Sequence, residues 1–158
     1  MSDTSTILRK LEACVVEELG AQRRVLERLE AQAAALRAGD PPALDLRGRE
    51  IEAEVEASLR RSQRRTALVS LLAGVWHVDS RSLTLGSIVE RSGRDGERLA
   101  RLRTELRRAT AATARALRRN ARAARAHQRT WGEVLEGVLG VVAAGDAQSG
   151  GRLVDTEA

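Results

Sequence analysis

The chain has 158 residues, among them 26 Ala, 21 Leu and 26 Arg, and it contains no Phe, no Tyr and only two Pro. With so few aromatic and β-branched side chains, a β-sandwich or barrel would have little to pack between its sheets. No apolar run approaches the roughly 20 residues of a membrane span. The N-terminus lacks the layout of a secretion signal, and the single Cys14 fits a reducing compartment. We therefore expect an all-α, soluble and cytoplasmic protein without a membrane span.

The formal net charge of +5 is distributed unevenly. Residues 91–129 carry 13 basic and three acidic side chains, whereas residues 130–158 carry one basic and five acidic side chains. An arginine-dense segment can mark an anionic partner, or it can be a solvated helix face. Both interpretations stay open at this point.

The first predicted helix covers residues 5–38. Asp3, Thr4 and Ser5 are suitable N-cap residues, and Gly39 stands where a C-terminal glycine belongs. Apolar and small residues recur at steps of three and four, which is one stripe of a helix. The stripe comprises Leu8, Leu11, Val15, Leu19, Gln22, Leu26, Leu29, Ala33 and Leu36.

Two prolines after Gly39 end this helix, and a second predicted helix covers residues 43–73. Its glutamates precede its arginines, which is the order that the helix dipole favours. The simplest product is an antiparallel hairpin of two long helices. Its predicted inward stripe comprises Leu44, Ile51, Val55, Leu59, Thr66, Val69 and Leu72.

Residues 74–96 break this pattern, with one short helix predicted at 84–90. A third long helix is predicted at 95–144, with an apolar stripe on one side and arginines on the other. We expect an elongated hairpin plus this C-terminal helix, a three-helix, coiled-coil-like domain over residues 1–145 and a flexible tail at 146–158. The apolar stripe is Leu99, Leu102, Leu106, Ala109, Thr113, Ala116, Asn120, Ala124, His127, Trp131 and Val134; the opposite face carries Arg101, Arg107, Arg108, Arg115, Arg118, Arg119, Arg122, Arg125 and Arg129.

No residue pattern indicates catalysis. His77 and His127 have no carboxylate or cysteine at metal-ligand spacing, and His127 fits a core histidine on the apolar stripe. Cys14 is interpreted as a small buried hydrophobic residue, and Asn120 as a polar residue that sets helix register. We therefore expect no enzyme activity, no metal, no cofactor and no small-molecule substrate.

The most informative segment is WGEVLEGVLGVV at residues 131–142. At helical spacing, its apolar residues occupy one arc, while glutamates and glycines occupy the opposite face. Three interior glycines cost roughly 3 kcal/mol relative to alanine, so this segment supports its own helix weakly. It either packs back onto the hairpin or becomes ordered on a partner. On the second interpretation, the binding residues are Trp131, Val134, Leu135, Val138, Leu139, Val141 and Val142.

The sequence resembles the FlgN family of flagellar type III export chaperones over residues 5–158. The resemblance depends on the order and spacing of short motifs. These are Ala38-Gly39-Asp40, Leu83-Thr84-Leu85 with Ile88, the mid-helix Asn120, the apolar segment 131–142 and the closing segment 152–158. The chain differs from the family at Ala123 and Ala124, where bulky aliphatic residues are usual, and its tail has no tyrosine.

The resemblance implies a cytoplasmic, non-enzymatic chaperone. Such a protein binds the C-terminal helical segments of hook–filament junction (hook-associated) proteins, its clients, prevents premature assembly and delivers them to the flagellar export gate. A homodimer is also allowed. An Arg-rich nucleic-acid-binding protein and a structural coiled-coil adaptor remain as alternatives, although no aromatic residues interleave the arginines for base stacking.

Overall fold

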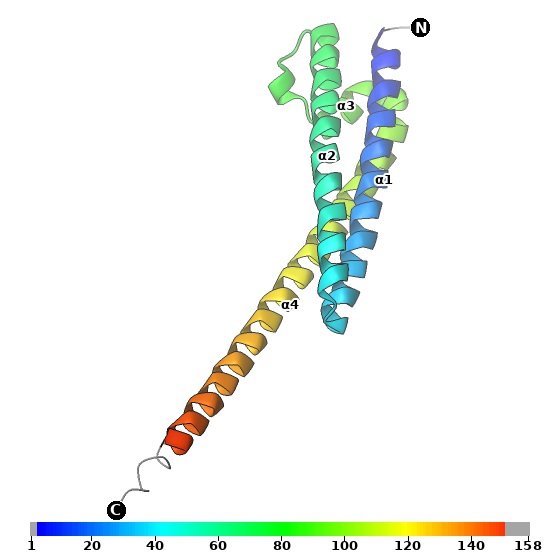
Figure 1. Cartoon of the computed structure of the whole chain (residues 1–158). Helices are drawn as coiled ribbons and strands as arrows, with labels where there is room; N and C mark the ends of the chain where they lie inside the picture. The colour runs from blue at the N-terminus through cyan, green and yellow to red at the C-terminus, as the bar shows by residue number, and fades with distance from the viewer. Residues whose placement is uncertain (1–2, 151–158) are drawn as a thin grey trace, which may run out of the picture. The chain divides into compact units, whose positions relative to one another are not determined.

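The computed structural model describes residues 3–150, without the side chains of Trp131, Leu135 and residues 138–150. The described chain is all-α, as the composition predicts. It comprises four α-helices, α1 (Asp3–Ala38), α2 (Pro41–Trp76), α3 (Leu85–Ser92) and α4 (Glu97–Gly150), and the 3-10 helices η1 (Ser80–Ser82) and η2 (Gly93–Gly96) (Figure 1). Contacts divide the chain into two compact units, Met1–Asn120 and Ala121–Ala158. No described helix is long and apolar enough to cross a membrane.

The predicted hairpin forms between α1 and α2, which lie side by side (Figure 1). Gly39 has a φ of 62°, the left-handed conformation that glycine adopts at low cost after a helix. The Asp40 carboxylate then accepts a hydrogen bond from the backbone N–H of Ala43 at 3.0 Å, and Pro41 occupies the first turn. The turn therefore ends one helix and begins the next within two residues.

The hydrophobic core of the first unit lies at the end of the hairpin remote from this turn. It joins α1, α2, α3 and the beginning of α4, so the short helix α3 anchors the connection to α4. Its buried members are Leu8, Leu11, Val15, Leu72, Ile88 and Leu99.

The connection between α2 and α4 is more ordered than the sequence predicts. The helix predicted at 84–90 is α3, which begins after Thr84 with a capping box: Thr84 and Ser87 each bond the other's backbone N–H. The helix predicted to end at Ala73 continues to Trp76, and His77, whose φ is 52°, is its C-cap. The 3-10 turn η1 was not predicted; it begins where the Asp79 carboxylate accepts a hydrogen bond from the N–H of Arg81 at 2.9 Å.

The predicted inward stripe of α2 is wrong in its middle. Val55 and Leu59 are 59% and 64% exposed, and Thr66 is also exposed. Polar side chains face α1 there instead: Arg61 is buried, and Glu54 is largely buried beside it. A period read along one helix cannot reveal that charged partners on the neighbouring helix make burial of these residues possible.

Polar contacts join α1 to the beginning of α4 at successive positions. Going down α1, they are Glu12 with Arg98 (3.7 Å), the Gln22 carbonyl with the Thr113 hydroxyl (3.4 Å), and the Leu29 carbonyl with Asn120 (2.7 Å). Because the residue numbers rise together on both helices, α1 and α4 run in the same direction within this unit.

Candidate client-binding surface

The predicted client-binding surface lies on the C-terminal part of α4, in the unit Ala121–Ala158. The backbone is helical throughout 131–142, so the chain adopts the spacing on which the prediction is based. Val134 is 49% exposed, and Glu133 and Glu136 are exposed. The other six predicted side chains lie outside the described residues: Trp131, Leu135, Val138, Leu139, Val141 and Val142.

His127 is exposed, so its interpretation as a core histidine is wrong. The stripe from Leu99 to Asn120 does face the core, because α1 lies against that side of α4. His127 lies beyond Asn120, in the second unit. The sequence repeat continues to His127, but a repeat alone does not bury a residue.

Asn120 is the last buried residue of this stripe, and it contacts polar groups of α1. Its side chain is 6% exposed, and Nδ2 donates hydrogen bonds to the Leu29 carbonyl at 2.7 Å and to Oε1 of Gln32 at 3.0 Å. A buried amide bonded in this way disfavours any shift of α4 along α1, because a shift would leave it without partners. This supports the prediction that Asn120 sets register.

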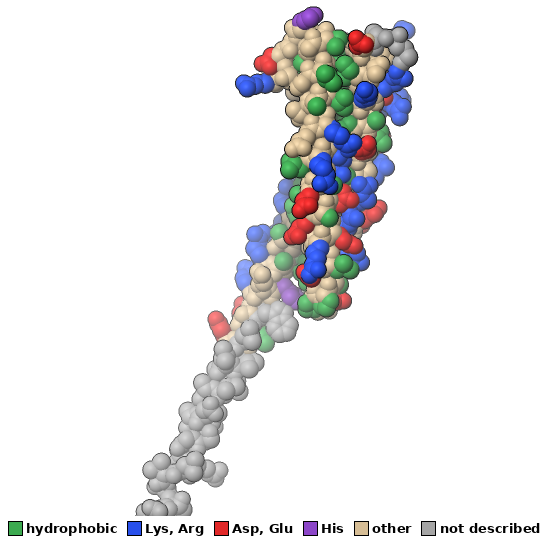
Figure 2. Space-filling model, turned by 45° about the horizontal axis from the view of Figure 1, so that its top comes forward, with side chains coloured by type: hydrophobic (Ala, Val, Ile, Leu, Met, Phe, Trp, Pro, Cys, Tyr) green, Lys and Arg blue, Asp and Glu red, His purple; other side chains and the backbone are tan. Residues whose placement is uncertain are grey.

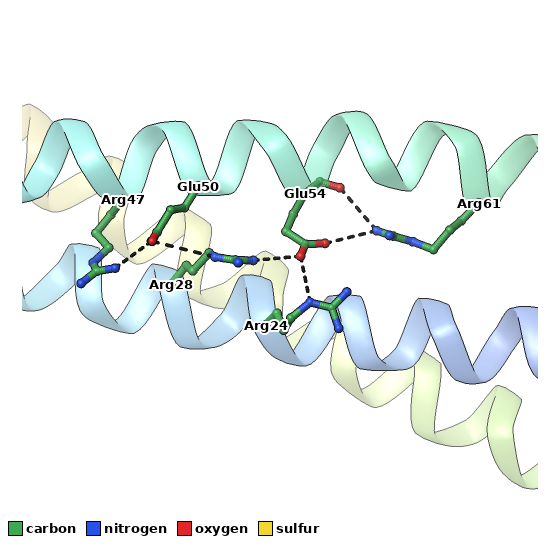
Figure 3. A network of polar contacts seen from close by, with 6 residues as sticks. All are labelled: Arg24, Arg28, Arg47, Glu50, Glu54 and Arg61. Carbon is green, nitrogen blue, oxygen red and sulfur yellow. Dashed lines mark hydrogen bonds and ion pairs between the residues drawn. The ribbon is translucent and has the colours of Figure 1, made fainter.

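A cluster of charged side chains crosses the α1–α2 interface near its middle (Figure 3). Oε1 of Glu54 accepts hydrogen bonds from Arg24 Nε at 2.8 Å and Arg28 Nη1 at 3.0 Å, while Arg61 Nη2 lies 3.4 Å from Oε2. Arg28 and Arg47 also pair with Glu50, at 3.9 and 2.8 Å. The hydrogen bond from Arg24, reinforced by Arg28, lowers the pKa of Glu54 to about 2 against its burial.

A hollow of about 420 Å³ is lined by residues of both α1 and α2. Its lining combines small and apolar side chains with three charged ones: Lys10, Ala13, Cys14, Glu17, Arg64, Ala67, Leu68 and the exposed Leu71. Cys14 is buried and unpaired, as expected, and burial raises the pKa of its thiol. The sequence did not single out this hollow, because a gap between helices depends on residues that are distant in the chain.

Arg115, Arg118, Arg119 and Arg122 are exposed, as the assignment of the arginine face predicts. On the hairpin, by contrast, acidic and basic side chains are interspersed over the surface (Figure 2). Both distributions are compatible with a protein that contacts other macromolecules through helix faces.

Comparisons with family models, with curated proteins and with solved structures find no match to this chain.

Proposed function

We propose that the protein is a cytoplasmic, non-enzymatic export chaperone of the FlgN type. Its clients would be the C-terminal helical segments of hook-associated proteins, which it keeps unassembled and delivers to the type III export gate. The buried Asn120 supports the proposal most directly: this residue, one of several positions on which the resemblance depends, forms an interior polar contact between α1 and α4.

The C-terminal part of α4 is the proposed client-binding surface. A client segment that polymerises through apolar helical faces needs a complementary apolar face to cover it. A helix carrying Trp131 and six aliphatic residues at helical spacing can supply that face, and an interface of about 1,000 Å² is enough for a specific, releasable complex. The exposure of Val134 is consistent with this role.

Truncation after Thr130 tests the location of the surface. The truncated protein should keep its helical circular dichroism signal and its thermal transition but fail to co-purify with the C-terminal segment of a hook-associated protein. A matched truncation after Gly145 removes the tail and retains the apolar segment, so it should still bind. Binding by the shorter protein would place the client surface within residues 1–130, outside the apolar segment.

Single substitutions test the mechanism of binding. Leu135→Asp and Leu139→Asp place an unpaired charge within the proposed apolar contact, so each should weaken client binding by about tenfold or more. Ala126→Asp adds the same charge at an exposed position on the other side of the helix and should have little effect. If thermal stability falls together with affinity, the segment belongs to the core and the proposal is wrong.

A further inference from the structure

The arginines of the hairpin and those of α4 differ in whether they have acidic partners. Eight arginines of α1 and α2 lie within 3.9 Å of a carboxylate oxygen. Residues 97–120 of α4 also contain eight arginines, but within the described part of the chain only Arg98 has such an ion pair, with Glu12. The paired set on the hairpin is Arg23, Arg24, Arg28, Arg47, Arg49, Arg61, Arg64 and Arg65.

The positive charge on this part of α4 is concentrated on the side that faces away from α1. The exposed arginines lie opposite the buried Leu99, Ala116 and Asn120. Residues 97–120 contain only two acids, Glu97 and Glu105, and Glu105 pairs with Arg23 of α1. Like charges along one helix face repel one another, and an anionic partner would relieve that repulsion. The exposed set is Arg101, Arg107, Arg108, Arg115, Arg118 and Arg119.

Three of these residues, Arg101, Arg108 and Arg115, are separated by seven residues each; we call them the arginine row. In the second unit the sequence repeats the spacing at Arg122 and Arg129, both exposed. Seven residues correspond to two helical turns, about 10.5 Å along the axis. A seven-residue repeat is the spacing at which a second helix, winding alongside, meets the same side of the first helix at every repeat.

The residues around the arginine row suit a helix better than a nucleic acid. Between Arg108 and Arg115 the exposed residues are Thr110 and Ala111, whose small side chains allow another helix to approach closely. Residues 97–120 contain no aromatic residue on which a base could stack. Each strand of a DNA duplex winds once around its axis in about 34 Å, so it would leave a straight row of arginines after a short distance.

We propose that the arginine row is a docking surface for an acidic helix of another protein, one that carries carboxylates at seven-residue spacing. Each guanidinium can pair with a carboxylate through two parallel hydrogen bonds, which gives the contact both energy and register. This surface is distinct from the apolar segment 131–142, so the inference stands whether or not the protein is an export chaperone.

Binding of designed peptides to the full-length protein tests the proposal. The probe is an alanine-rich helical peptide with glutamates every seven residues; the control peptide has the same composition with its glutamates scattered around the helix. At low salt, the protein should bind the probe about tenfold more tightly than the control peptide. The triple substitution Arg101→Gln, Arg108→Gln and Arg115→Gln should abolish that preference. Thermal unfolding confirms that the variant remains folded.

A matched variant separates the arginine row from net charge. Arg37→Gln, Arg60→Gln and Arg81→Gln remove the same charge from exposed positions elsewhere and should leave the preference unchanged. The proposal is overturned if both triple variants lose equal affinity, if the two peptides bind equally, or if duplex DNA of random sequence competes more strongly than the probe. Strong competition by DNA would assign the face to nucleic acid instead.

Discussion

At the scale of single residues, two polar side chains with little exposure connect the helices of the first unit. Asn120 is one, and Glu54 is the other. Asn120 donates hydrogen bonds to Leu29 and Gln32 of α1, and Glu54 accepts hydrogen bonds from Arg24 and Arg28 of α1. The cost of desolvating such groups is recovered only in one arrangement of the helices, so they add specificity more than stability.

Two substitutions of Asn120 should show whether the hydrogen bonds that its amide donates stabilise the protein. Asn120→Ala removes two hydrogen bonds and should lower the free energy of unfolding by about 1–2 kcal/mol. Asn120→Asp should cost more, because a carboxylate would face the Leu29 carbonyl and Oε1 of Gln32, both acceptors. Urea denaturation of the two variants measures the difference. Equal losses would show that the amide N–H groups do not determine the contact.

Glu54 should make stability depend on pH at the acidic end. Its pKa in the folded protein is about 2, below the ordinary 4.5, so its contribution is fully present above about pH 4.5. That contribution is lost progressively as the pH falls from about 4.5 through 2, because the carboxyl group then becomes protonated in both the folded and the unfolded protein. Glu54→Gln should therefore destabilise the protein at pH 7 by an amount that shrinks towards pH 2. The measurement is urea unfolding of both proteins between pH 2 and 7; a constant difference would contradict this assignment.

At the scale of helices, two leucines of α2 should differ sharply in their contributions to stability. Leu72 is fully buried in the core, so Leu72→Ala should lower the free energy of unfolding by about 3 kcal/mol. Leu59→Ala, at an exposed position on the same helix, should change it by less than about 0.5 kcal/mol. Thermal denaturation of both variants provides the comparison. A large effect at Leu59 would show that this face is covered in solution, for instance by a second copy of the chain.

Comparison of α2 with α1 and α4 shows which buried residues the sequence can predict. Periodicity identified the core-facing residues of α1 and of α4 as far as Asn120, because those stripes are apolar and continuous. It failed on α2, where Val55 and Leu59 are exposed and Glu54 and Arg61 turn inwards, since only the position of α1 decides which side is buried. The candidate site is predicted by the sequence alone, with Val134 its only residue whose side chain the structure describes.

At the scale of the whole chain, the first unit contains its own core. All six buried core residues precede Asn120 in the sequence. A fragment ending at Thr130 should therefore unfold cooperatively, with a midpoint within a few degrees of that of the full-length protein. Differential scanning calorimetry of the two proteins checks this. A loss of cooperativity in the fragment would mean that residues after Thr130 complete the fold.

The hydrophobic core joins the two helices of the hairpin near Leu11 and Leu72, whereas the ion pairs of Glu50 and Glu54 lie nearer the turn, where Leu29 is also buried. Dissolved salt screens the ion pairs but strengthens or spares apolar burial. Raising the salt concentration should therefore loosen the turn end first, with amide hydrogen exchange accelerating at residues 41–56 while residues 68–76 stay protected. If this prediction holds, ionic strength controls how far the two helices separate near the turn, while the hydrophobic core keeps their other ends together.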